Sequence, residues 1–185
     1  MNPVSRVPLL VWFLIPTFIV VGIGVWFFSK SSTGQQADET KPAAVSKTVE
    51  GTVDYPIIGR EHITQGTAVS TYNSNPPSSG SHWPSPAKNG IYDTQLADEQ
   101  LIHDLEHGYI WISYKSDVSD DVKGELKKIV NDDNWKIVLG PRDKNETMIA
   151  LVAWGRVLKL DTPDYDKIRD FIKTYRNRGP EKTPD

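Results

Sequence analysis

The chain has 185 residues, which is enough for one domain with a hydrophobic core and some additional segments. It contains no cysteine, and this excludes disulfides, a thiol nucleophile and any cysteine-bound metal centre. The formal net charge of −3 gives no electrostatic reason to expect nucleic acid as a partner.

The N-terminal region predicts a membrane anchor. After a short tail (residues 1–6), residues 7–28 are uncharged, and such a helix crosses a hydrocarbon core of about 30 Å. The segment is longer than the apolar region of a cleavable signal peptide and ends in "WFFSK", without a small-x-small cleavage site. We therefore predict a single-pass protein of the cell membrane, with its C-terminal domain on the extracytoplasmic side.

Two irregular segments follow the predicted anchor. Residues 29–50 are rich in small and polar side chains and lack hydrophobic periodicity, so a flexible linker is expected. Residues 51–96 contain many glycines and prolines, which is typical of ordered loop with short strands. A loop-rich stretch of this length inside a domain is often functional.

Regular elements are predicted in the second half of the chain. Their order is helix (98–107), strand (109–114), helix (119–132), strand (135–139), a strand interrupted near Gly155 (148–160) and a last helix. Asp98 and Thr162 are expected to cap the first and last helices, with Pro163 at the first helical position of the latter. The strands at 135–139 and 148–154 are placed to form an antiparallel hairpin.

These patterns predict the α+β class. We expect a compact single domain over residues 51–179, with a small mixed or antiparallel sheet covered by helices. Residues 180–185 are expected to be a disordered tail. The whole chain therefore consists of tail, transmembrane helix, linker, globular domain and second tail.

The segment "HDLEHG" is the most informative motif for function. His103 and His107 lie four residues apart on one face of the predicted helix, with Glu106 beside them, so the two imidazoles can share a metal ion. His82 lies in a proline-braced loop, and His62 lies in the same loop-rich region. We predict a metal site of His82, His103 and His107, with His62 as a possible fourth ligand and Glu106 next to the ligands.

Other interpretations of the motif stay open at this point. The histidines can simply form the polar edge of a helix C-terminus, in a domain that binds a partner without metal. The motif also matches H-x-x-E-H, in which two histidines bind zinc and the glutamate is the general base of a peptidase. A metal-dependent hydrolase with Glu106 as base is therefore the main alternative to a binding protein, and a binding protein is favoured over an enzyme.

Longer motifs give a family resemblance. The segments "YNSNPPSSGSHW" (72–83), "LIHDLEHGYIWISY" (101–114) and "ALVAWGR" (150–156) resemble the domain-of-unknown-function 3105 family, and "IIGREHI" (57–63) is similar to its opening motif. The resemblance also implies one N-terminal membrane span, as is typical of that family, in agreement with residues 7–28. The resemblance implies that His62, His82, His103, Glu106 and His107 all fall on motif positions, without assigning an activity.

The donor atoms narrow the choice of metal without fixing it. All-nitrogen ligation suits copper(II), zinc or nickel, and the affinity order slightly favours copper over zinc. Only two methionines are present in the whole chain, which argues against a methionine-rich copper(I) site.

Overall fold

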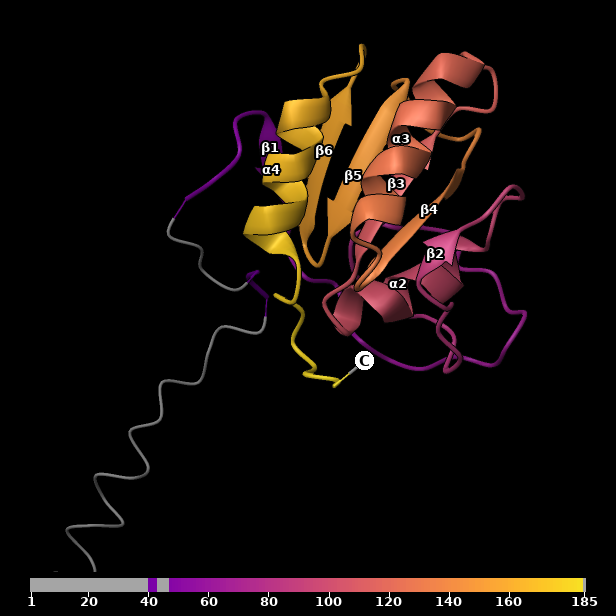
Figure 1. Ribbon diagram of the computed structural model, residues 1–185. Helices are drawn as coiled ribbons and strands as arrows, with labels where there is room; N and C mark the ends of the chain where they lie inside the picture. The colour runs from indigo at the N-terminus through magenta and orange to yellow at the C-terminus, as the bar shows by residue number, and fades with distance from the viewer. Residues whose placement is uncertain (1–39, 43–46, 185) are drawn as a thin grey trace, which may run out of the picture. The chain divides into compact units, whose positions relative to one another are not determined.

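The computed structural model describes residues 40–42 and 47–184, which form an α+β domain built on one sheet (Figure 1). The helices of this part are α2 (Asp98–Glu106), α3 (Asp120–Asp132) and α4 (Tyr165–Tyr175). The strands are β1 (Thr52–Asp54), β2 (Gly90–Ile91), β3 (Ile110–Tyr114), β4 (Ile137–Pro141), β5 (Ile149–Ala153) and β6 (Arg156–Leu160). The predicted α+β class is confirmed.

The sheet is mixed, with the strand order β1-β6-β5-β3-β4-β2. β4 pairs in parallel with β3 on one side and with β2 on the other, whereas the remaining neighbours are antiparallel. The segment β3–α3–β4 is therefore a parallel crossover unit, in which α3 carries the chain back to the starting edge.

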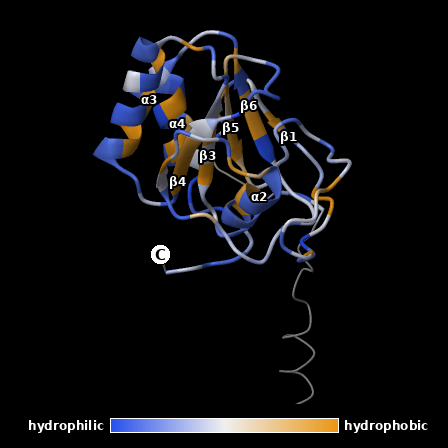
Figure 2. Cartoon of the chain, turned by 90° about the vertical axis from the view of Figure 1, so that its right-hand side faces the viewer, coloured by the Kyte–Doolittle hydropathy of each residue, from blue (hydrophilic) through white to orange (hydrophobic). Residues whose placement is uncertain are grey.

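Both faces of the sheet are covered, because alternate residues of the central strands enter two separate hydrophobic clusters. On β3, Ile110 and Ile112 pack with α3 and α4, whereas Trp111 packs on the opposite face. That opposite face is covered by Leu101 and Leu105 of α2 and by aromatic side chains of the loop-rich segment. Figure 2 shows the hydrophobic strands enclosed between polar outer surfaces.

The predicted hairpin between the strands at 135–139 and 148–154 is wrong. β3 lies between β4 and β5 and pairs with both, so these two strands do not contact each other in the ladder. β5 instead forms a hairpin with β6. Gly155, at φ 70, makes the turn between them and interrupts the long apolar run at the predicted place.

Both predicted helix caps differ from the structure. Ala97, whose side chain has no acceptor atom, occupies the N-cap of α2, and Asp98 is the first helical residue, where its carboxylate binds Arg142. In α4 the N-cap is Asp164, whose side chain accepts the Lys167 N–H at 2.9 Å, and not Thr162. Aspartate is among the preferred residues at this position, and the helix begins at Tyr165, after the proline.

No helix among residues 40–42 and 47–184 is long and apolar enough to cross a membrane. The predicted anchor at residues 7–28 lies outside the described residues.

Candidate metal centre

Two extended segments of the loop-rich region run side by side and carry one histidine each. His62 and His82 form a parallel bridge, in which the Ile63 N–H donates to the His82 carbonyl at 2.8 Å and the His82 N–H donates to the Glu61 carbonyl at 3.0 Å. Gly80 donates to Gly59 at 3.2 Å one step earlier. Backbone hydrogen bonds therefore fix the spacing of the two imidazoles.

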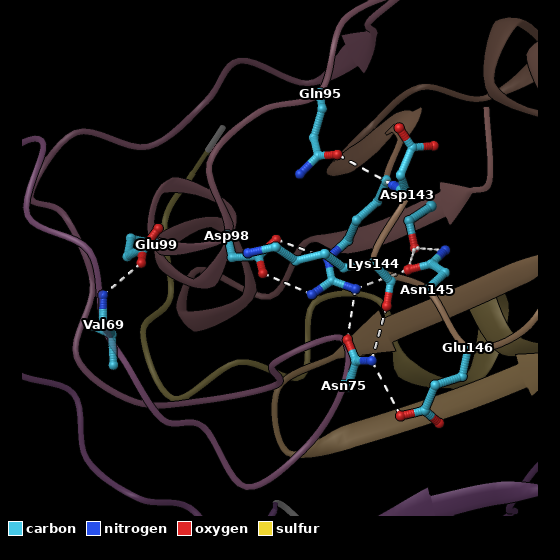
Figure 3. Close-up of polar contacts among 11 residues, drawn as sticks. Val69, Asn75, Gln95, Asp98, Glu99, Asp143, Lys144, Asn145 and Glu146 are labelled. Atoms are coloured by element: carbon cyan, nitrogen blue, oxygen red, sulfur yellow. Dashed lines mark hydrogen bonds and ion pairs between the residues drawn. The ribbon is translucent and has the colours of Figure 1, made fainter.

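Helix α2 supplies the third histidine, and its first turn is held from two sides (Figure 3). The buried Arg142 guanidinium donates to both carboxylate oxygens of Asp98, at 2.9 and 2.8 Å. The Glu99 carboxylate accepts the Val69 N–H at 2.8 Å. Because a bidentate arginine–carboxylate pair is directional, these contacts set the axis of α2, from which His103 projects.

The C-terminal end of α2 places His107. Gly108, at φ 83, follows the C-cap residue His107, and its N–H donates to the Leu105 carbonyl at 2.9 Å. The Tyr109 N–H donates to the Asp104 carbonyl at 2.9 Å, which completes a Schellman motif. The glycine after the second histidine is thus what ends the helix and leaves His107 on the last turn.

The structure brings together a histidine triad, consisting of His62, His82 and His103. One ring nitrogen of each lies within 4.8 Å of those of the other two. His82 and His103 are buried, whereas His62 is exposed. Nitrogens that share one tetrahedral ion lie about 3.4 Å apart, because each bond is about 2.0–2.1 Å long. Movements of about 1.5 Å or less between donors would therefore close the triad around an ion.

Hydrogen bonds to the backbone fix the tautomers of the two buried rings. His82 Nδ1 lies 2.8 Å from the Gly80 carbonyl, and His103 Nδ1 lies 2.6 Å from the Trp83 carbonyl. Since a carbonyl only accepts, both Nδ1 atoms carry the proton. In the neutral rings Nε2 then bears the lone pair, which is the arrangement typical of metal-binding histidines.

Glu106 lies against the buried end of the triad. Its Oε2 atom is 3.0 Å from His82 Nε2, and both side chains are almost fully buried. The contact lacks hydrogen-bond alignment, and Nε2 has no hydrogen-bond partner among the described residues. Two acceptor atoms this close repel each other unless a positive charge lies between them. A proton on His82 or a metal ion can supply that charge.

The pKa values of the three buried groups follow from this arrangement. Burial acts to lower the pKa of His82, but the Glu106 carboxylate and the Gly80 carbonyl outweigh burial, and the pKa is raised. Burial lowers the pKa of His103; the Trp83 carbonyl opposes it, and the neighbouring imidazoles reinforce it. Burial acts to raise the pKa of Glu106, yet contact with His82 lowers it overall. At neutral pH, His103 is a neutral donor and Glu106 an anion.

The fourth histidine is adjacent to the triad. His107 Nε2 lies 3.2 Å from His103 Nε2 and 3.3 Å from Glu181 Oε2. The structure thus brings all five residues of the predicted site into one region, with His62 in the triad. The prediction that His107 is a ligand stays a prediction.

Sequence reasoning missed two charged residues at this site. Arg60 Nε lies 3.8 Å from Glu106 Oε1, and Glu181 reaches His107 from the C-terminal residues. Arg60 stands two residues before His62, a spacing that places both side chains on one side of an extended segment. Its position beside the site could therefore have been predicted from the sequence. The position of Glu181 could not have been predicted from the sequence, because it depends on how the chain returns after α4.

The fold and site together define a small α+β domain with a partly buried histidine cluster that can hold a metal ion. Residues 62–185 match the family model described as "Protein of unknown function (DUF3105)". This match covers more than half of the chain, and the protein belongs to that family. No curated protein and no solved structure matches the chain.

Proposed function

We propose that this protein binds a transition-metal ion through His62, His82 and His103, on the extracytoplasmic side of a membrane. The observation that carries the proposal is the convergence of three imidazoles from separate segments, with donor nitrogens within 4.8 Å of one another. Two of the rings donate Nδ1–H to backbone carbonyls, which leaves Nε2 for an ion.

Copper(II) is the favoured ion, slightly ahead of zinc. Imidazole suits both ions, and the order of affinities places copper above zinc for nitrogen donors. The chain has no cysteine, so no thiolate ligand is available to change this preference for copper. Attachment to the membrane through residues 7–28 rests on their uncharged length and would keep the metal-binding domain at the cell surface.

Metal titration tests this proposal directly. The full-length chain, purified without a histidine tag and kept in mild detergent, is titrated with Cu(II) and with Zn(II) while its thermal unfolding is followed. An ion at one hundred times its Kd stabilises by about 2.7 kcal/mol, which corresponds to about 8 °C. His82→Gln and His103→Gln are expected to lose this shift, and Glu61→Gln, which leaves the triad intact, is the matched control.

The thermal unfolding of the wild-type protein decides whether the proposed function holds. If neither ion raises its unfolding temperature, the proposed function is wrong. If the two histidine variants keep the full shift, the ion binds somewhere else on the chain.

A metal-dependent hydrolase is the second candidate, and Glu106 is the observation that favours it. Its carboxylate is buried beside the triad, and contact with His82 lowers its pKa, so it is ionised at neutral pH and can accept a proton. A cavity of about 410 Å³, lined in part by Arg60, offers space for a substrate nearby. The test is hydrolysis of ester and phosphoester substrates by the metal-loaded protein. Glu106→Gln should keep the metal and lose any such activity.

A further inference from the structure

His107 and Glu181 form a pair at a more exposed edge of the site, and we call them the entry pair. His107 Nε2 lies 3.3 Å from Glu181 Oε2, and the two side chains are 14% and 50% exposed. By contrast, the triad members His82 and His103 are 0% and 5% exposed. An imidazole and a carboxylate at this separation are two ordinary metal ligands that water reaches more easily than the buried nitrogens.

The entry pair touches the triad at one point. His107 Nε2 lies 3.2 Å from His103 Nε2, and their ring centroids are 4.6 Å apart. The distance between these nitrogens is close to the separation of about 3.4 Å expected for two ligands of one ion. An ion on His107 can therefore bind His103 before it leaves His107, so it need not return to water between the two positions.

Charged side chains lie at both exposed approaches to the triad. Near His62, the 40% exposed Arg60 guanidinium lies 3.8 Å from Glu106, and the exposed Glu61 carboxylate stands between Arg60 and His62 in the chain. At the entry pair, the Glu181 carboxylate lies 3.3 Å from His107 Nε2, where it can bind an incoming cation together with the imidazole, while the Lys136 ammonium contacts the His107 carbonyl. Fixed charges of this kind change association rates by attracting or repelling ions over several ångströms.

The C-terminal strap, which we define as residues 177–184, holds Glu181 in place. The Glu181 N–H donates to the Glu106 carbonyl at 3.1 Å, and the Asn177 N–H donates to the Gly108 carbonyl at 2.7 Å. Thr183 binds the Lys136 ammonium through its carbonyl at 3.0 Å and its hydroxyl at 3.1 Å. Backbone contacts on both sides of Glu181 thus set its position relative to His107.

We propose that His107 and Glu181 are the site through which metal ions enter and leave the triad. This inference rests on the proposed function and adds a route to it. The pair binds the ion briefly, passes it to His103 and accepts it again on release. Because a transfer site speeds both directions equally, its loss slows uptake and release together and leaves the equilibrium affinity almost unchanged.

The test compares rates with affinity. Full-length protein in mild detergent is mixed with Cu(II) in a stopped-flow instrument. Quenching of tryptophan fluorescence reports uptake, since Trp83 is a neighbour of the site through its backbone carbonyl, which accepts a hydrogen bond from His103. Release is measured by adding an excess of chelator. For Glu181→Gln and His107→Gln we expect both rates to fall about tenfold. The dissociation constant is expected to stay within about threefold of the wild-type value. Glu61→Gln, which removes an exposed carboxylate outside the pair, is expected to behave as the wild type.

Three results would overturn the inference, and they separate it from the proposed function. Unchanged rates in both variants would show that ions enter elsewhere. Weakened equilibrium binding in His107→Gln, by tenfold or more, would make His107 a permanent ligand and not a transfer group. A wild-type protein that binds no Cu(II) would reject the proposed function itself, which neither of the first two results does.

Discussion

Replacing Gly179 with alanine is expected to detach the C-terminal strap from α2. A Cβ atom at this position would lie 2.8 Å from the Glu106 carbonyl carbon and closer still to its oxygen and to the Gly108 nitrogen. All three neighbours belong to the backbone at the end of α2, so no flexible side chain can move aside. The strap must retreat by about 1 Å to reach ordinary contact distance.

The expected destabilisation has two parts. Overpacking against a rigid backbone costs about 1–3 kcal/mol. The retreat also breaks the hydrogen bond from the Glu181 N–H to the Glu106 carbonyl, which contributes about 1 kcal/mol. We therefore expect the free energy of unfolding to fall by about 2–4 kcal/mol, or the unfolding temperature by about 6–12 °C. Moving Glu181 away from His107 should also slow metal uptake.

Thermal and urea unfolding, followed by circular dichroism, measure this effect. Gly124→Ala is the matched control, because Gly124 lies inside α3 and a Cβ atom there meets nothing within 4 Å. Alanine at that exposed helical position should stabilise the protein by up to about 1 kcal/mol. The reasoning is refuted if Gly179→Ala unfolds within about 0.5 kcal/mol of the wild type, since overpacking at a rigid contact cannot cost so little.

Three further predictions concern other parts of the molecule. Arg142→Met leaves the Asp98 carboxylate without its bidentate partner and is expected to cost about 3 kcal/mol by urea unfolding; a loss below about 1 kcal/mol would contradict the structural role of the pair. The hydrogen bond from Arg176 lowers the pKa of Asp133 below its ordinary value of 3.8. Because the pair is exposed, Asp133→Asn should lower the free energy of unfolding by less than about 1 kcal/mol at pH 7. This difference in stability between variant and wild type should disappear as the pH falls through the lowered pKa. An undiminished difference in acid would argue against that pair. The full-length chain should stay in the membrane pellet after carbonate washing, whereas the chain without residues 7–28 should appear in the supernatant. Release of the full-length chain by the wash would contradict the predicted anchor.

The elements of the fold were predictable because local patterns determine them, whereas the order of the strands depends on distant pairings. The apolar runs around Ile112 and Leu151 identified β3 and β5, and Gly155 marked the turn between β5 and β6. The hairpin prediction failed because neighbours in sequence were assumed to be neighbours in the sheet. The parallel pairing of β3 with β4 depends on how α3 packs, and no local pattern carries that information.

The same distinction applies to the candidate site. The spacing of His103 and His107 predicted their contact directly, since helical periodicity places them on one face. The approach of His82 and His62 was expected only from a proline-braced loop, and the parallel bridge that joins them depends on backbone pairing across the loop. Glu181 was beyond sequence reasoning, because a chain end has no periodicity from which to predict its contacts.

The three segments that carry the triad have a consequence for local opening of the domain. In polymer terms, an ion bound to His62, His82 and His103 closes two successive loops of about 20 residues each, as two cross-links would. As long as the ion stays bound, each loop closure removes conformational freedom worth about 3 kcal/mol from forms in which these segments have opened locally. Metal removal should therefore speed backbone amide exchange most in residues 59–103, and least in β5 and β6, which lie outside both loops.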